Sequence, residues 1–456
     1  MAEFCEALIC GAGMAGVSAA YHLAVRQGVR DILLVDERPA LSLTSDKSTE
    51  CYRNWWYGAD GAMVSLMNRS IDLLEALAEQ SGDIFHLNRR GYLFLTGDRE
   101  RLAQMMEAAQ QPPKFGAGAL RVHRGEASDA PYTPSPREGY KGVPDGADLF
   151  LDATKLRQAF PFLGDGVIGG LHVRRAGWLS AQQLGAYLLE EARRRGVRLW
   201  RARVSGVRLR RGRVERVELG DGTRVKTGCF VNAAGPYLGE IAAMLGIELP
   251  IFAELHLKVA LPDPLGLVPR HAPLLIWNDP QRLPWTPAEQ RLLEEDTQDA
   301  WLLQEMPPGI HTRPEGGAGS KIILLLWEYR PQRVAPVFPI PLDERYPEIV
   351  LRGMAAMLPE FRAYFERPPR PCLDGGYYIK TKENRPLIGA LPVEGAYVMG
   401  AFSGFGIMAS CAAGELLAAQ IAGAELPPYA PAFSLERYAD PAYQRLLQDW
   451  GDSGQL

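Results

Sequence analysis

Three glycines near the N-terminus, followed by an acidic residue, have the spacing of a dinucleotide-binding turn. Gly11, Gly13 and Gly16 follow an apolar run, and Asp36 closes the next apolar run about twenty residues later. The first glycine permits a tight turn, the second lets the backbone approach a pyrophosphate, and the third lets the helix pack closely on the strand. The phosphates would lie at the helix N-terminus, where free N–H groups and the helix dipole favour anions. The pattern predicts a bound dinucleotide whose ribose hydroxyls contact Asp36.

A second glycine-rich turn lies near the C-terminus. A strand expected at 396–399 enters the run Gly-Ala-Phe-Ser-Gly-Phe-Gly at 400–406, and a helix is expected from about 407 to 422. The N-terminus of such a helix stabilises negative charge on a ring system placed against it. The alternative is a strand-to-helix turn that only packs.

Hydrophobic periodicity indicates the elements that must position these turns. Residues 110–147 are rich in proline and glycine and hold no clear period, so they are expected to form a functional or a disordered loop. Thr286 begins a capping box with proline at the first helical position, which predicts a helix that serves as a lid, a partner surface or a solvated surface helix. Other expected elements are helices at about 14–27, 62–80 and 182–195, strands at 32–36, 91–95 and 229–232, and a β-meander at 204–225.

Composition and charge are ordinary for a globular protein. The 456 residues can bury a large core and are expected to divide into two domains. The net charge of −4 gives no basic surface for nucleic acid. The six cysteines have no metal-binding spacing, so no metal site is predicted and a reducing, cytoplasmic location is expected. No basic segment precedes the apolar run at 7–25, so the glycine turn explains it better than a signal peptide, and no other stretch is expected to span a membrane.

Three separated segments together resemble one family. They are the N-terminal glycine unit, the Val-Asn-Ala-Ala-Gly turn at 231–235, and the Arg-Pro-Leu-Ile-Gly segment with the late glycine turn at 385–406. Their order and spacing resemble the FAD-dependent amino-acid oxidase superfamily, nearest its sarcosine oxidase, glycine oxidase and proline dehydrogenase branch. The resemblance covers nearly the whole chain, with 110–147 and 281–306 as insertions.

The resemblance implies an α/β fold with two discontinuous domains. One is a Rossmann-like FAD-binding domain, and the other is an α+β substrate domain built on an antiparallel sheet, with the flavin at the interface. The FAD-binding domain would comprise 1–85, 150–245 and 371–456, and the substrate domain 86–149 and 246–370.

The resemblance also implies which residues hold the FAD. Val204 would meet the adenine through its backbone, and Ser48 and Thr49 would lie beside the pyrophosphate. Some relatives attach the flavin covalently through a cysteine at the position of Gly376, so the FAD is expected to be non-covalent here. On the flavin side the resemblance implies Ala233, Ala234, Gly235, Tyr237, Gly404, Phe405, Gly406, Ile407 and Met408. The remaining expected contacts are Gly11, Gly13, Met14, Ala15, Gly16, Asp36, Glu37 and Arg38.

Each residue expected on the substrate side has two possible roles. Sarcosine oxidases anchor a substrate carboxylate with a lysine at the position of Met408, whereas the proline dehydrogenase branch often has methionine there. Arg53 is therefore the expected anchor, the alternative being a surface or phosphate-contacting arginine. His311 either faces the pocket or is an exposed or satisfied histidine, and Tyr378 either lies over the flavin or packs. Lys321 has the spacing of the family lysine that helps oxygen react with reduced flavin, and its alternative is a solvated lysine.

The resemblance implies an enzyme that oxidises the C–N bond of a secondary or N-methylated amine by hydride transfer to the flavin. The expected amine is an amino acid. The electrons would pass to oxygen or to an electron carrier. One alternative is an alcohol dehydrogenase of the glycerol-phosphate type. Another is a flavin-bearing electron-relay or structural subunit of a hetero-oligomeric dehydrogenase. The expected partners are a small-molecule amine and an acceptor, without nucleic acid or an integral membrane segment, and oligomer formation is left open.

Overall fold

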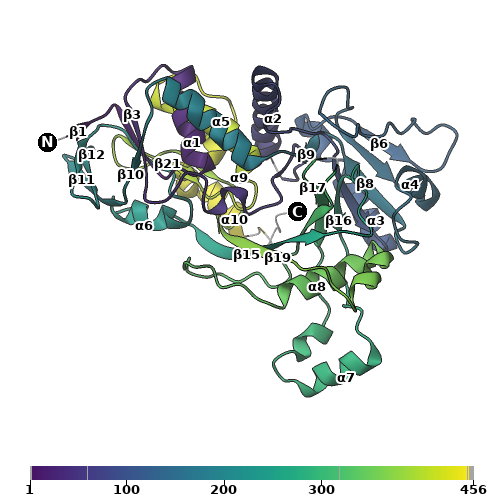
Figure 1. The fold of residues 1–456 in the computed structure, drawn as a ribbon. Coiled ribbons are helices and arrows are strands. Elements are labelled where there is room, and N and C mark those ends of the chain that lie inside the picture. The colour runs from purple at the N-terminus through teal and green to yellow at the C-terminus, as the bar shows by residue number, and fades with distance from the viewer. Residues whose placement is uncertain (1–2, 59, 318, 449, 451–456) are drawn as a thin grey trace.

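Two large sheets organise the protein, which a computed structural model describes for residues 3–58, 60–317, 319–448 and 450. The six-stranded sheet and the nine-stranded sheet lie on opposite sides of the molecule (Figure 1). The long strands β15 (Phe252–Pro262) and β19 (Cys372–Lys380) pair along their length and extend from one side towards the other. The predicted fold, a dinucleotide-binding part and a second part built on a separate sheet, is confirmed.

The six-stranded sheet contains the predicted strand–turn–helix–strand unit. β2 (Ala7–Cys10) and β3 (Ile32–Asp36) pair in parallel, and α1 (Met14–Tyr21) connects them. β14 (Phe230–Asn232) pairs in parallel with β2 and with β21 (Ala396–Gly400), so these strands end at one edge of the sheet. The glycine turn at 11–16, the turn at 233–235 and the late glycine turn therefore meet there. The outer strands are β10 (Arg198–Arg201) and β20 (Leu387–Ala390).

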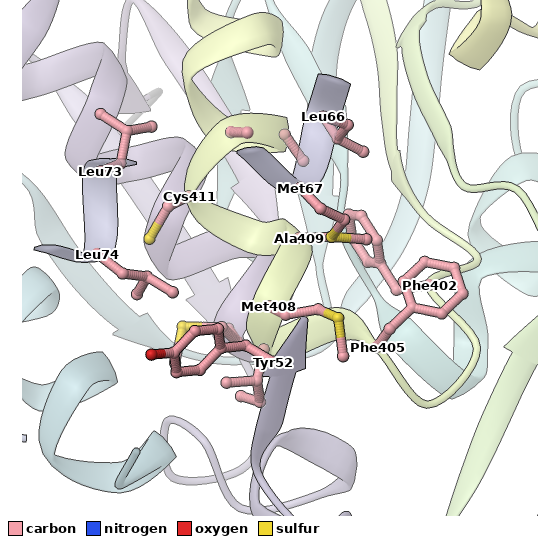
Figure 2. Close-up of a cluster of buried hydrophobic side chains, with 14 of the residues drawn as sticks. Tyr52, Leu66, Met67, Leu73, Leu74, Phe402, Phe405, Met408, Ala409 and Cys411 are labelled. Atoms are coloured by element: carbon pink, nitrogen blue, oxygen red, sulfur yellow. The ribbon is translucent and has the colours of Figure 1, made fainter. Parts of the chain in front are cut away.

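Helix α9 (Gly406–Ile421) packs between other helices and the strands β4 (Cys51–Arg53), β20 and β21. It packs against α1, which also contacts α5 (Ala181–Arg194), and against α2 (Ala62–Ser81). Nearly all of α9 is buried, as expected for a helix that is apolar all round. Figure 2 shows side chains of α2 around the first turns of α9, with Met408 near Tyr52 and Phe405. This packing fixes the helix N-terminus at the sheet edge.

The nine-stranded sheet is antiparallel except where β16 pairs with β5 and where β6 pairs with β7. Its strands β8 and β19 come from segments that the resemblance assigns to the FAD-binding domain, and the division of the chain into two domains stays a prediction. In spatial order after β19 and β15, the strands are β18 (Ile322–Leu326), β17 (His311–Glu315), β16 (Leu274–Trp277), β5 (Tyr92–Thr96), β8 (Gly169–Val173), β7 (Ala147–Phe150) and β6 (Leu120–His123).

The smaller elements include the predicted meander, which forms most of a four-stranded sheet. α7 (Pro287–Glu295) has the predicted capping box and projects from the rest of the molecule (Figure 1). Within the described part of the chain, no helix combines the length and the apolar character needed to cross a membrane. The remaining strands are β1 (Glu3–Phe4), β11 (Val204–Arg210), β12 (Arg213–Leu219), β13 (Arg224–Lys226), β4 (Cys51–Arg53) and β9 (Ala176–Trp178). The remaining helices are α3 (Arg99–Ala108), α4 (Ala153–Ala159), α6 (Leu238–Ala243), α8 (Tyr346–Gly353) and α10 (Pro441–Gln448).

The expectation of a loop at 110–147 is wrong in part, because this segment contributes strand β6 and the start of β7 to the large sheet. Four residues are too short a run for strand periodicity to be recognised. The segment is tied to the sheet by a buried cluster of charges around Asp148. The carboxylate of Asp148 accepts hydrogen bonds from Arg174 at 2.7 Å, from Arg121 at 2.7 Å and from His123 at 3.0 Å.

We expect Asp148→Asn to destabilise the protein by about 3–5 kcal/mol, because it leaves the buried Arg174 guanidinium without its carboxylate. Burial raises the pKa of Asp148, but hydrogen bonds from Arg121, Arg174 and His123 outweigh burial and hold the pKa below its ordinary value. The stabilisation is therefore present above a pH of about 4 and lost as the pH falls. Denaturant unfolding measures the effect, with the exposed Asp165→Asn as a control expected to lie within about 0.5 kcal/mol of wild type. Equal stability of the two variants would contradict the prediction.

Candidate active site

A narrow hollow of about 130 Å³ follows the sheet edge where β2, β14 and β21 end. α1 begins at this hollow with a glycine at its N-cap and with no acidic residue in its first turn, so the partial positive charge of its first N–H groups faces the hollow. An anion fits such a helix end. The hollow is lined by these residues expected to bind FAD: Gly11, Gly13, Met14, Ala15, Asp36, Ser48, Ala233, Ala234, Gly235, Gly404, Gly406 and Ile407.

Each glycine of the first turn is required for a different structural reason. A Cβ on Gly16 would lie 1.8 Å from the carbonyl oxygen of Gly11, so only glycine lets the helix pack here. Gly11 has a φ of 105° and lies against the backbone of Ala233. Gly13 has ordinary backbone angles, and a Cβ there would lie 3.3 Å from the hydroxyl of Ser45 at the wall of the hollow. Gly13 therefore keeps space open for a ligand, whereas Gly11 and Gly16 are needed for the fold.

The carboxylate of Asp36 fixes the turn and reaches a second, adjoining hollow. Its Oδ2 accepts the backbone N–H of Ala12 at 2.7 Å, and its Oδ1 accepts that of Arg38 at 2.8 Å. The adjoining hollow of about 110 Å³ is lined by Asp36, by Val204, which was expected at the adenine, and by the expected FAD contacts Glu37 and Arg38. Tyr237, expected on the flavin side, lines this second hollow and not the first. The two hollows give an elongated ligand continuous walls from Val204 to the late glycine turn, as FAD requires.

The loop after β3 differs from the expectation at one point. Ser45, in the short 3₁₀ turn Thr44–Asp46, accepts the backbone N–H of Met14 at 2.9 Å and so lies at the α1 N-terminus. Ser48 lines the hollow, as predicted, but Thr49 lines only the larger cavity described next. Ser45, rather than Thr49, therefore lies with Ser48 in the wall of the hollow, and the contact of Ser48 and Thr49 with a pyrophosphate stays a prediction.

A cavity of about 550 Å³ adjoins the hollow and shares Ser48, Tyr378 and Gly404 with it. An FAD whose flavin lies at the late glycine turn, as the family resemblance implies, would have this cavity beside its flavin. The structure brings together in its walls these residues predicted on the substrate side: Arg53, His311, Tyr378, Phe405 and Met408.

Lys321 does not belong to this group. It is exposed and precedes β18, whose other end brings Leu326 and Glu328 into the cavity wall. The Gly-Gly-Ala-Gly spacing marks the start of the strand rather than the end that reaches the cavity. The prediction that Lys321 assists oxygen is not supported by its position.

Arg53 occupies an aromatic cage. It is 5% exposed, and its guanidinium lies 4.6 Å from the ring centre of Trp56, 5.5 Å from Tyr92 and 5.7 Å from Phe94. Burial lowers the pKa of Arg53, yet an arginine stays charged at every ordinary pH. A buried cation beside apolar rings binds a carboxylate strongly, because little water competes for it.

His311 faces the cavity as a neutral imidazole. Its Nδ1 lies 2.8 Å from the carbonyl oxygen of Gly309, which can only accept, so Nδ1 carries the hydrogen. Burial lowers the pKa of His311 to about 4. The Nε2 atom is therefore an acceptor at neutral pH. The alternative of an exposed histidine is excluded, since His311 is buried.

Sequence reasoning missed a group of polar residues at one wall of the cavity, here called the polar wall: Glu254, Glu328 and Lys380, which line the cavity, and the buried His256, which contacts both carboxylates. Glu254 and His256 alternate with apolar residues along β15, so their side chains leave the same face of the strand. Polar residues at every second position of an otherwise apolar strand were the signal that could have found them. Lys380 reaches the same wall from β19, and Glu328 follows β18.

The polar wall is a tight set of contacts. Lys380 Nζ donates to Glu254 Oε2 at 2.8 Å, and His256 Nε2 lies 3.3 Å from the same oxygen and 3.5 Å from Glu328 Oε1. The His256 ring stacks on Tyr378 with 3.9 Å between ring centres. Burial raises the pKa of both carboxyls. For Glu254 the hydrogen bonds from His256 and Lys380 outweigh burial and lower the pKa to about 2, whereas burial prevails for Glu328 and raises the pKa to about 7.

Gly376 lies outside the hollow but supports its wall. A Cβ at this position would lie 2.9 Å from the Cβ of Lys47, in the loop that also carries Ser45 and Ser48. Gly376 therefore lets strand β19 approach this loop closely, which brings Tyr378 to the wall that the hollow and the cavity share.

Curated relatives align with part of the chain. The chain is 25% identical over 254 residues to the mitochondrial dimethylglycine dehydrogenase of Rattus norvegicus, an alignment of 55% of this chain and 26% of that protein. It is 24% identical over 317 residues to the mitochondrial dimethylglycine dehydrogenase of Homo sapiens, covering 67% of this chain and 33% of that one. The chain thus spans about a quarter to a third of the length of the curated relatives it matches.

Solved structures share the fold over nearly the whole chain. The L-proline dehydrogenase from P. horikoshii matches with a TM-score of 0.73 and 20% identity, over 96% of this chain and 99% of that one. The glycine oxidase from Geobacillus kaustophilus matches with a TM-score of 0.71 and 17% identity, over 95% and 99% of the two chains. The family model described as FAD dependent oxidoreductase (DAO) matches residues 6–420, and the protein belongs to this family of FAD-dependent enzymes.

Proposed function

We propose that the protein oxidises the C–N bond of a secondary or N-methylated amino acid. The observation that carries this proposal is the caged Arg53, which lies in the wall of the cavity that adjoins the FAD hollow. A buried guanidinium with aromatic neighbours fits a carboxylate. Related proteins are named for dimethylglycine, proline and glycine, all of them amino acids whose oxidation begins at a C–N bond.

In this proposal the chain binds, orients and shields the substrate. Bound FAD supplies the hydride acceptor. Arg53 holds the substrate carboxylate, and His311 Nε2 accepts a hydrogen bond from the bound amino acid. Phe405 and Met408 form an apolar wall that excludes water, and Met408 leaves room for a substrate bulkier or more apolar than sarcosine. Water hydrolyses the resulting imine after hydride transfer.

The proposal also covers how FAD is attached and which molecule accepts its electrons. FAD is held without a covalent link, because the position that carries cysteine in covalent flavoproteins of this family is Gly376. The electrons pass to oxygen or to a carrier. All six cysteines are free thiols, which supports a reducing, cytoplasmic location.

Anaerobic mixing of the FAD-loaded protein with a panel of compounds tests the function. Sarcosine, N,N-dimethylglycine, longer N-methyl amino acids and proline are compared with their carboxyl-free analogues and with glycerol 3-phosphate. Loss of the flavin absorbance band with the amino acids, fastest with those bulkier than sarcosine, is expected. Bleaching by glycerol 3-phosphate alone would favour an alcohol dehydrogenase, and no bleaching by any compound would favour an electron-relay subunit.

A further inference from the structure

A half-buried carboxylate, that of Glu328, lines the cavity without a role in the proposal above. Glu328 and Glu254 both lie in the cavity wall, but their surroundings differ. Glu254 is held as an anion by Lys380 and lies beside His256. Glu328 contacts His256 Nε2 at 3.5 Å through Oε1, and its side chain keeps 24% of its surface exposed. Glu328 is therefore the carboxylate that a molecule in the cavity can reach.

The proposed reaction requires such a group. A secondary or tertiary aliphatic amine is protonated at neutral pH, much like the lysine amine with its pKa of about 10.4. The ammonium nitrogen has no lone pair with which to form a C=N bond as the hydride leaves. The substrate must therefore lose a proton before or during the oxidation.

We propose that Glu328 is the catalytic base that removes this proton, an inference that rests on the proposed function. The N–H bond of the ammonium breaks and an O–H bond forms on the Glu328 carboxylate, with no change in oxidation state. The freed lone pair then forms the C=N bond, while the hydride leaves the neighbouring carbon with both electrons of the C–H bond. FAD is the oxidant, and the carboxyl proton later returns to water.

The cavity favours this transfer. Burial penalises both the ammonium and the carboxylate, and moving one proton between them removes both charges. The raised pKa of Glu328, about 7, matches what general-base catalysis near neutral pH requires. Burial lowers the pKa of both His256 and His311, so these two side chains stay neutral near neutral pH. Charged and titratable groups also border Glu328 and the cavity from several elements. They are Glu254 and His256 on β15, Tyr378 and Lys380 on β19, His311 on β17, Tyr346 on α8, Cys51 and Arg53 on β4, Tyr92 on β5, and Arg333 and Lys382 at other wall positions.

The test is Glu328→Gln, with the rate of anaerobic flavin reduction by an N-methyl amino acid followed from pH 6.5 to pH 10. At pH 7 we expect a loss of about hundredfold, the usual contribution of a general base. As the pH approaches the pKa of the free amine, the substrate arrives already neutral, so the variant should recover towards the wild-type rate. Glu328→Asp, which keeps a carboxylate, should retain an intermediate rate at pH 7. The exposed Glu305→Gln serves as the matched control and should follow the wild-type profile.

A loss of the same factor at every pH would overturn the inference, because it would indicate a binding or structural role. Should Glu328→Gln not fold with FAD, Glu328→Asp carries the test through a change in the same pH profile, and an unchanged profile would count against the proposal. If amines reduce the wild-type flavin and the loss in Glu328→Gln is the same at every pH, the proposed function holds and only the role of Glu328 as the base is refuted. Failure of every amine to reduce the wild-type flavin removes both.

Discussion

Gly13→Val is expected to give a folded protein that does not retain FAD. Gly13 lines the hollow at the α1 N-terminus and has backbone angles that valine can adopt, so the added side chain fills ligand space and meets the Ser45 hydroxyl rather than the backbone of the turn. Two lost charge-assisted hydrogen bonds to a pyrophosphate would cost roughly 3–6 kcal/mol. That corresponds to at least about a hundredfold loss of affinity. FAD released by heat, measured per mole of protein purified under identical conditions, quantifies the effect.

The matched control is Gly166→Val, at an exposed glycine where a Cβ would meet nothing within 4 Å. This variant should keep wild-type FAD content. Circular dichroism separates loss of FAD from loss of fold in the Gly13 variant. A folded Gly13→Val protein with stoichiometric FAD would show that the hollow does not hold the pyrophosphate.

Arg53→Ala is expected to lower the affinity for amino acid substrates by about tenfold to a hundredfold, because one charge-assisted hydrogen-bond pair of roughly 1.5–3 kcal/mol is lost. The change should appear in the substrate concentration that half-saturates anaerobic flavin reduction. Arg53→Lys should recover part of the affinity, since lysine keeps the charge but loses the planar fork that binds both carboxylate oxygens.

Carboxyl-free amines are the internal control for Arg53. They lack the group that Arg53 binds, so their half-saturating concentrations should be nearly the same in wild type and in Arg53→Ala. An equal loss for amines with and without a carboxylate would show that the alanine variant has damaged the aromatic cage of Trp56, Tyr92 and Phe94 rather than removed an anchor.

The FAD side of the site was predictable because its signals are local. The turn at 11–16, the acid at Asp36 and the late glycine turn each lie within one strand–turn–helix unit, and parallel pairing of β2, β14 and β21 brings them to one edge. Thr49 shows the limit of this reasoning. The 3₁₀ turn at 44–46 directs Ser45 to the N-terminus of α1, and the chain then runs along the cavity, where Thr49 lies. The residue spacing alone does not indicate this turn.

The substrate side was less predictable because distant strands build it. Arg53, Glu254, His311, Glu328 and Tyr378 come from separate segments, and the pairing register decides which end of each strand reaches the cavity. Lys321 precedes β18 and Glu328 follows it, and a short match in sequence does not show which end of the strand reaches the cavity. The alternation along β15 was visible in the sequence, but only the fold shows that its polar face borders a ligand cavity.

The most direct test of the proposed function is a single-turnover experiment with an N-methyl amino acid and no oxygen. The account predicts that each reduced flavin yields one demethylated amino acid and one formaldehyde, or one oxo acid and one methylamine when the α-carbon is oxidised. Both routes cleave a C–N bond with the stoichiometry of hydride transfer followed by hydrolysis. Reduction of the flavin by the amino acid without either product pair, or reduction by a polyol with formation of its carbonyl compound, would contradict C–N oxidation as the function of this protein.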